Sequence, residues 1–486
     1  MKLELNKGEG LANMENKSHE LRRGLSSRHI TMISIGGTIG TGLFLASGNV
    51  VSKAGALGGP IAYLVIGILV YVLMKGLGEM STFMPIPGAY TTYSGLFVHP
   101  VLGFMVGWNL CINGFLGLGA EIVGGGMILN QFFPSIPPVA FCIMLSLLIL
   151  GLNMIDVKTY GEAEYWFAGI KVIAIIIFLI VGVLMIFGVI GKQGFIGLSN
   201  LNSHSMFPNG FSAVILMMTG VIWSYLGVET VVTAAGETKN PQKNVPKAIN
   251  TIFFRILIFY VGSVTVIGLV VPFENVSVLS NGYAGLFGLA GIPGAATIMN
   301  IVILTSLASA ANSIVYALSR TLVALSKEGK APKALAKVNK RGIPMNAVLL
   351  TLFLGQVSLI TNFVSPDKVF IWLISIAGFN TLLGWFGSFL SHYRFRKWLT
   401  AQGGSVDKLK FKMGTYPIPT IICLFVLVAI AIYTAYSSDT RFSFYIGAPM
   451  LVLYFIIGTI LNKKGKLQEP NYKPFLDAHI NDKEIN

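Results

Sequence analysis

The sequence contains few charged side chains, and acidic ones are the scarcer kind. Only 11% of its 486 residues are charged, whereas soluble domains carry roughly 25%. So few charges could not cover the water-exposed surface of a soluble protein of this length. The 20 acidic residues against 35 basic ones give a net charge of +15, which would suit nucleic acid if the protein were soluble. The composition argues instead for a membrane protein.

Cysteine and histidine are also scarce, which excludes several kinds of site. The three cysteines fall within apolar runs, too far apart for a zinc motif. The six histidines lie outside these runs or at their edges. A membrane enzyme would need a catalytic cluster at membrane depth, so we expect no enzyme, no metal and no cofactor. Residues 1–29 are polar, and the first apolar run is therefore expected to be a membrane segment rather than a secretory signal.

Long apolar runs make up most of the chain, since 54% of its residues are hydrophobic. A helix needs about 20 apolar residues to cross the hydrocarbon layer, and helices satisfy their backbone groups internally in lipid. We predict an all-α membrane protein with twelve transmembrane helices. The predicted spans are 30–49, 58–78, 101–128, 137–155, 163–188, 211–235, 248–272, 296–318, 345–362, 369–391, 417–436 and 443–461.

Basic residues are distributed very unevenly among the gaps between these spans. The termini and the even-numbered gaps hold 28 of the 35, and the odd-numbered gaps hold only Lys53, Lys192, Lys368 and Arg441. Cytosolic loops carry such an excess, so both termini are predicted to be cytosolic, in a multi-pass protein of the cell membrane. The same loops would attract anionic membrane lipid, which explains the net charge without nucleic acid.

Two spans contain interruptions, and they lie five spans apart. Span 1 has four glycines between Gly36 and Gly42, each about 1 kcal/mol less favourable in a helix than alanine. Span 6 carries a charge, Glu229, shortly after Trp223 and Gly227. Broken helices at matching positions of two inverted halves indicate a transporter site. We therefore predict a five-plus-five inverted repeat with broken helices 1 and 6, although close packing through small residues would also explain the glycines.

An unwound turn in span 1 would offer free N–H groups to a carboxylate. Glu121 and Glu229, which lie within spans, would suit a substrate ammonium, or they are protonated or paired structural residues. Glu164 is closer to a span edge and is interpreted as an interface residue. Lys171 lies deep in span 5, where desolvation favours the neutral amine; it would exchange a proton, snorkel or form a fixed ion pair. Both Lys171 and Glu229 are candidates for proton coupling.

Three other residues have a functional and a packing interpretation. Trp223 precedes the interruption of span 6 and would either cap a substrate or pack in the core. Asn312 and Ser313 form a polar stripe in span 8, which would line a site or join helices.

The chain resembles the amino acid permeases of the amino acid–polyamine–organocation (APC) superfamily from about Leu21 to about Tyr436. Lysine-specific permeases show the most similar pattern. The stretches that carry the resemblance are Gly36–Phe44, Gly161–Lys171, Gly236-Glu237 with Asn240-Pro241, Lys327–Pro332 and Ser391–Arg396.

This resemblance implies a LeuT-like fold in which helices 1 and 6 hold the substrate. It divides the chain into an N-terminal tail (1–29), a ten-helix core (30–391), a loop with helices 11 and 12 (392–461) and a C-terminal tail (462–486). It implies proton coupling at Lys171, which matches the position of a sodium ion in related transporters. The implied substrate-binding residues are Thr38, Ile39, Gly40, Thr41, Gly42, Trp223, Gly227 and Glu229, which the carboxylate of Glu121 would join.

We expect a proton-coupled amino acid symporter whose partners are a small-molecule amino acid substrate, protons and membrane lipid, with the proton gradient in place of a cofactor. Lysine or another cationic amino acid fits the two glutamates. A permease for neutral amino acids and an amino acid exchanger are the alternatives that remain open, ahead of a channel or a nutrient sensor.

Overall fold

The computed structural model describes residue 32 and residues 39–86, 89–154, 157–201, 206–229, 232, 241–339, 341–437, 440–467 and 471–481, without the side chains of 89, 90, 157–160, 241, 361 and 362. Every regular element within these residues is a helix, so the all-helical prediction is confirmed. Eight helical segments of this part are long and apolar enough to cross a membrane: Ala46–Phe83, Pro100–Phe132, Gly161–Ile186, Gln242–Val270, Ala295–Lys327, Pro366–Ala401, Ile418–Tyr436 and Arg441–Lys463.

The helices follow one another along the chain. In order they are α3 (Thr41–Phe44), α4 (Ala46–Phe83), α5 (Ala89–Phe97), α6 (Pro100–Phe132), α7 (Pro138–Asn153), α8 (Val157–Ile186), α10 (Gly210–Ser224), α12 (Pro241–Arg255), the π-helix η2 (Ile256–Gly262), α13 (Ser263–Val270), α14 (Val276–Ser280), α15 (Gly282–Leu289), α16 (Ala295–Lys327), the 3₁₀ helix η3 (Lys333–Ala336), α17 (Met345–Gly355), the 3₁₀ helix η4 (Gln356–Asn362), α18 (Pro366–Ala401), the 3₁₀ turn η5 (Val406–Lys408), α19 (Ile418–Tyr436), α20 (Arg441–Lys463) and α21 (Lys473–Ile480).

Proline marks the start of several long helices. Pro100, Pro138 and Pro366 occupy the first turns of α6, α7 and α18. Proline is favoured there because its fixed φ suits the helix and its missing N–H would have no partner within the helix. At the start of α6, the side chain of His99 also accepts a hydrogen bond from the N–H of Val101 at 3.2 Å. Local sequence signals therefore place these helix ends.

The second half of predicted span 1 and span 2 are joined without a loop. Helix α4 runs from Ala46 to Phe83 across a kink at Gly55, whose φ is +90°. An L-residue is strained at such a φ, so glycine allows the sharp change of direction. The gap predicted between residues 49 and 58 is therefore only a kink. The helix also extends beyond the predicted end at residue 78.

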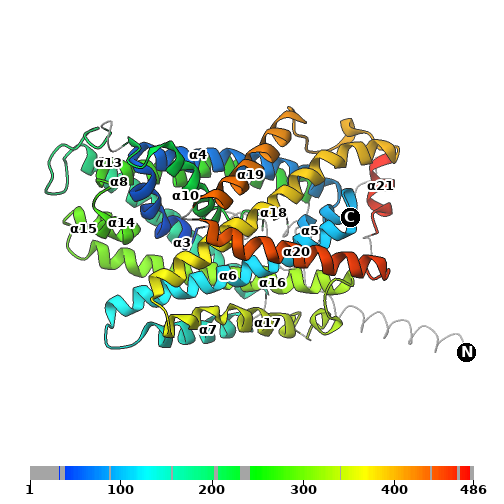
Figure 1. The fold of residues 1–486 in the computed structure, drawn as a ribbon, viewed down its shortest axis with the longest axis horizontal. Coiled ribbons are helices and arrows are strands. Elements are labelled where there is room, and N and C mark those ends of the chain that lie inside the picture. The colour runs from blue at the N-terminus through cyan, green and yellow to red at the C-terminus, as the bar shows by residue number, and fades with distance from the viewer. Residues whose placement is uncertain are drawn as a thin grey trace, which may run out of the picture.

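Helix α6 lies at the centre of the bundle, where it packs against α18, α16 and α7 (Figure 1). Helix α4 packs against α10, α12 and α13. Helices α7 and α17 lie next to each other along one edge, while α14 and α15 lie at the opposite end of the bundle from α21 (Figure 1). Because α6 and α16 contact each other along the centre, side chains from both can face the same interior space.

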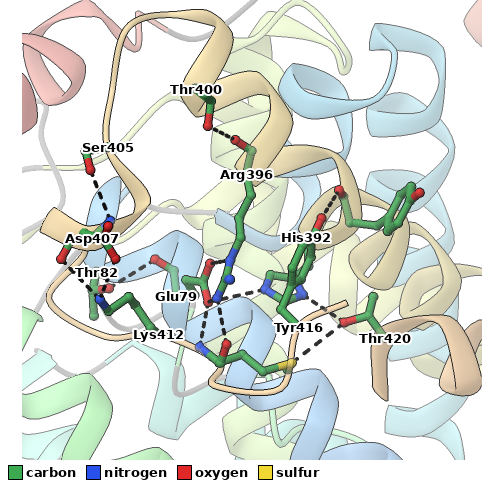
Figure 2. A network of polar contacts seen from close by, with 12 residues as sticks. Glu79, Thr82, His392, Arg396, Thr400, Ser405, Asp407, Lys412, Tyr416 and Thr420 are labelled. Carbon is green, nitrogen blue, oxygen red and sulfur yellow. Dashed lines mark hydrogen bonds and ion pairs between the residues drawn. The ribbon is translucent and has the colours of Figure 1, made fainter. Parts of the chain in front are cut away.

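A buried carboxylate joins α4, α18 and the segment before α19, as Figure 2 shows. Glu79 is 0% exposed and accepts hydrogen bonds from Arg396 Nε at 2.7 Å and Nη2 at 2.8 Å. The N–H of Met413 donates to the same carboxylate at 2.7 Å, and His392 Nε2 lies 3.5 Å from it. Glu79 lies just beyond the predicted end of span 2 at residue 78, yet its hydrogen bonds join distant segments of the chain in the interior.

The C-terminal tail contains a helix that the sequence analysis did not predict. In α21, Leu476 is buried, and the ring of Tyr472 just before the helix lies 5.2 Å from that of Trp398 in α18. Lys408 Nζ donates to the carbonyl of Ile480 at 3.0 Å. This helix therefore packs against the end of the bundle near α18 (Figure 1).

Candidate functional site

The described part of span 1 becomes helical only at Thr41. Gly40 precedes α3 with φ −145° and ψ −147°, outside the helical region. The N–H of Thr41 donates to both oxygens of Glu121 at 3.3 Å, and its hydroxyl donates to Oε1 at 3.1 Å. A carboxylate is favoured at the start of a helix, where free N–H groups and the dipole are positive. The carboxylate of Glu121 from α6 therefore binds the beginning of α3.

Residue types at this opening are restricted by close contacts. A Cβ atom on Gly40 would lie 2.5 Å from Glu121 Oε1, and one on Gly42 would lie 2.4 Å from the Cα of Ser224. Tyr63 donates to the carbonyl of Gly42 at 3.3 Å and lies 2.8 Å from the hydroxyl of Ser224. Glycine at position 42 is therefore required for this packing of α3 against the backbone of α10, whereas a side chain at position 40 would displace the Glu121 carboxylate.

The chain of span 6 leaves the helical path at Ser224. Residues 225–229 form turns, and Gly227 has φ +93°. The N–H of Gly227 donates to Glu229 Oε2 at 3.0 Å, and Trp385 Nε1 of α18 donates to Oε1 at 2.5 Å. The Glu229 carboxylate is thus held at the end of α10 by its own turn and by a second helix.

The two interruptions face each other across one polar contact. Trp223 Nε1 donates to Thr41 Oγ1 at 3.2 Å, which ties the last turn of α10 to the first of α3. The hydroxyl of Ser306 in α16 donates to the carbonyl of Ile39 at 3.0 Å. Backbone and side chains from α3, α6, α10 and α16 therefore meet in one place.

A cavity opens between these helices. It contains most of the predicted substrate-binding residues together with side chains of α6 and α16. Its lining residues are Gly40, Gly42, Leu110, Asn113, Gly114, Glu121, Trp223, Ser224, Leu226, Gly227, Glu229, Ala310, Ser313, Ile314, Ala317, Leu318 and Thr321. Two carboxylates line it, and the described lining residues include no cationic side chain.

Of the other predicted site residues, Ser313 lines the cavity, and the rest of those that the structure describes lie around it. Ile39 and Thr41 are buried beside the cavity. Ser313 faces it, whereas Asn312 accepts a hydrogen bond from Asn153 Nδ2 of α7 at 2.7 Å. Asn312 and Ser313, which form the predicted polar stripe, therefore have different surroundings. Thr38 lies outside the described residues.

Lys171 is buried behind the cavity with a partner on its own helix. Its Nζ lies 3.9 Å from Glu164 Oε1, and both side chains are at most 1% exposed. The hydroxyl of Ser309 in α16 donates to the same Glu164 oxygen at 2.6 Å. The interpretation of Glu164 as an interface residue near the span edge is therefore wrong: it is a fully buried member of an ion pair.

Comparison with known proteins decides the family. A family model described as Amino acid permease matches residues 29–471. The chain belongs to the amino acid permease family. It is 38% identical to lysine-specific permease LysP of Escherichia coli strain K12 over 453 residues, which cover 90% of this chain and 93% of LysP. It is 36% identical to amino-acid permease RocE of Bacillus subtilis strain 168 over 455 residues (93% and 97%), and 39% identical to histidine permease HisP of Lactococcus lactis subsp. cremoris strain MG1363 over 427 residues (86% and 89%).

The predicted family resemblance is therefore confirmed, and the permease is a multi-pass membrane transporter rather than an enzyme. The family implies that its substrate is an amino acid, a small molecule. No single relative fixes the side chain of that molecule, because lysine, histidine and threonine/serine carriers are all between 35% and 39% identical to it.

Two site residues were missed by the sequence analysis for a common reason. Trp385 and Ser309 act as hydrogen-bond donors to buried carboxylates, and each comes from a helix distant in the chain. A tryptophan or serine within an apolar span has no local signal that separates it from a packing residue. These partners can be identified only from the way in which the helices are oriented toward one another in the structure.

Proposed function

We propose that the permease is a proton-coupled symporter that imports lysine or another cationic amino acid across the cell membrane. One observation carries the cationic assignment: the described cavity wall combines two interrupted helices with the carboxylates of Glu121 and Glu229 and has no cationic side chain. Backbone groups of the interruptions suit the substrate's own carboxylate and ammonium. A cavity with excess negative charge then favours a substrate whose side chain carries a second positive charge. The names of two relatives, which are lysine-specific permeases, support this assignment.

The fold we propose for this activity has twelve spans in a LeuT-like five-plus-five inverted repeat, followed by helices 11 and 12. Both termini lie in the cytosol, as the excess of basic residues in the termini and even-numbered gaps supports. Spans 1, 2, 6 and 7 rock against the others around the cavity, and Trp223 closes it from the outside. The contact between Trp223 and Thr41 supports this role, because it bridges the two interruptions.

Proton coupling gives the concentrating power. One proton moved through 100 mV supplies about 2.3 kcal/mol, or roughly 50-fold in substrate concentration. Lys171 and Glu229 are the proposed proton carriers, because both are buried titratable groups at or behind the cavity. No covalent step takes place.

A neutral amino acid is the second candidate substrate. Both carboxylates already have partners, Glu121 on Thr41 and Glu229 on Trp385. Leu110, Ile314 and Leu318 make part of the cavity wall apolar. These observations favour a side chain without charge.

The deciding experiment measures uptake of labelled lysine by proteoliposomes that contain the purified permease and are acidic outside. We expect accumulation that needs the pH gradient and is inhibited by cationic amino acids above all others in a competition panel. Inhibition by neutral amino acids alone would show that the substrate is a neutral amino acid and not a cationic one. Uptake that needs internal amino acid instead of a pH gradient would show an exchanger.

A substitution of Lys171 separates coupling from binding. Lys171→Ala removes the ammonium from the interior, so proton-driven accumulation should fall from roughly 50-fold to near equilibrium. Exchange of labelled for unlabelled substrate should persist in part, because Lys171 does not line the cavity. Accumulation at the wild-type level would remove Lys171 from the mechanism.

A further inference from the structure

Glu164 and Lys171 lie on one side of α8 and are buried together. They are seven residues apart, which is two turns, so their side chains project from the same helix face. The Glu164 carboxylate lies 3.9 Å from the ammonium, and the hydroxyl of Ser309 holds it against α16 at 2.6 Å. No hydrogen-bond partner of Glu164 Oε2 is found within the described part of the chain. The pair is therefore a fixed feature of the α8–α16 contact.

A second carboxylate, that of Glu121 on the cavity wall, is within electrostatic range of the same ammonium. Lys171 interacts electrostatically with Glu121 as well as with Glu164. Glu121 lines the cavity, whereas Glu164 does not. The three side chains thus form a cluster in which one end contacts the cavity and the other is sealed between helices.

Other elements packed against α8 bring no countercharge to this cluster in the described residues. Helix α16 contributes the neutral side chains of Ser309 and Asn312. Helix α15 contributes the phenol of Tyr283 and η2 the phenol of Tyr260, and α13 contributes no titratable side chain. Arg255 just before η2 interacts electrostatically with Tyr225 and Tyr260.

The charge of the cluster determines how many protons it holds. With both carboxylates and the amine ionised, the formal charge is −1, and an uncompensated charge in the interior is strongly disfavoured. One added proton makes the cluster neutral. Because the groups interact, this proton belongs to the cluster and to no single residue.

We propose that Glu164 is the positioning residue for Lys171, and that Glu121, Lys171 and Glu164 together carry one exchangeable proton in each transport cycle. This inference rests on the proposed symport. Water in the cavity gives the proton to the cluster at Glu121 on one side of the membrane. The same carboxyl returns it to water on the other side, so one proton crosses for each cycle. Glu164 keeps the ammonium in place and supplies the negative charge that makes the proton necessary.

The test compares Glu164→Gln with wild type in proteoliposomes. The amide keeps the size of the side chain and can still accept a hydrogen bond from Ser309. It removes one negative charge, so the charges of Glu121 and Lys171 cancel without an added proton. We expect proton-driven accumulation to fall from roughly 50-fold to near equilibrium. Substrate-driven proton flux should vanish, and the rate of exchange should lose its pH dependence. Glu164→Asp should restore accumulation in part.

Thr305→Ala is the matched control, since it removes a hydroxyl of α16 that donates to the carbonyl of Val302 and leaves the three side chains of the cluster unchanged. It should retain proton-driven accumulation. Accumulation and pH dependence like wild type in Glu164→Gln would overturn the proposal. Equal loss of exchange and accumulation in Glu164→Gln and Glu164→Asp would also overturn it, because that pattern marks a purely structural residue. If wild type itself shows no pH-driven accumulation, the symport proposal fails instead.

Discussion

Single residues determine how closely the interrupted helices can approach. Gly40 leaves room for the Glu121 carboxylate at the first N–H of α3, and Gly42 leaves room for α10. The glycines of span 1 were recognisable in the sequence, and so was the charge of Glu229. The sequence could not distinguish the two explanations for those glycines, because both close packing and an open turn require a missing side chain. The structure contains both features, because the backbone of Gly40 is non-helical and Gly42 packs closely against Ser224.

Gly40→Val tests this arrangement at the level of one side chain. Its Cβ would lie 2.5 Å from Glu121 Oε1, so the glutamate or the start of α3 must move. Overpacking of this kind is unfavourable by roughly 1–3 kcal/mol, and we expect substrate affinity to fall by about 5- to 150-fold. Binding of labelled substrate to purified protein measures the change.

Gly220→Ala on α10 is the matched control, because a Cβ there would have no atom of the described residues within 4 Å. It should bind substrate like wild type. An unaltered affinity in Gly40→Val would show that the opening of span 1 does not contribute to binding.

At the scale of elements, the helices were more predictable than their ends and partners. Apolar length located the long helices, because lipid and the protein interior both select apolar side chains. The kink at Gly55 was missed, since a positive φ within continuous apolar sequence resembles any other glycine. The pairing of Glu164 with Lys171 and of Glu79 with Arg396 depends on how helices are rotated, which a single sequence does not reveal.

The junction of α4, α18 and the segment before α19 provides a stability test. Arg396→Ala would leave the Glu79 carboxylate buried without its strongest partner, and such a loss destabilises by about 3–5 kcal/mol. We expect a clear drop in the thermal unfolding midpoint of the detergent-solubilised protein. The apolar spans should still insert into the membrane.

Lys412→Ala is the comparison variant within the same view (Figure 2). Lys412 is 41% exposed and Asp407 97% exposed at 3.5 Å, and exposed pairs contribute only about 0–1 kcal/mol. Its midpoint should stay close to that of wild type. Equal midpoints for both variants would mean that Glu79 is not an essential anchor.

Across the whole molecule, the uneven distribution of basic residues predicts how the chain is oriented in the membrane. Lys192 and Lys337 are both exposed and lie in gaps that we assign to opposite sides of the membrane. A membrane-impermeant thiol reagent applied to intact cells should label Lys192→Cys and not Lys337→Cys. The background is low, because the described cysteines Cys111, Cys142 and Cys423 are buried. The reverse labelling would invert the predicted topology.

An experimental structure of the permease with its amino acid bound would show where the substrate lies. We predict the substrate carboxylate within hydrogen-bond distance of the backbone N–H groups around Gly40–Gly42, and its ammonium near the carbonyls that end α10 before Gly227. The side chain should point toward α6 and α16. A substrate bound elsewhere, with helices 1 and 6 continuous and no space beside Gly40 and Gly227, would contradict the account.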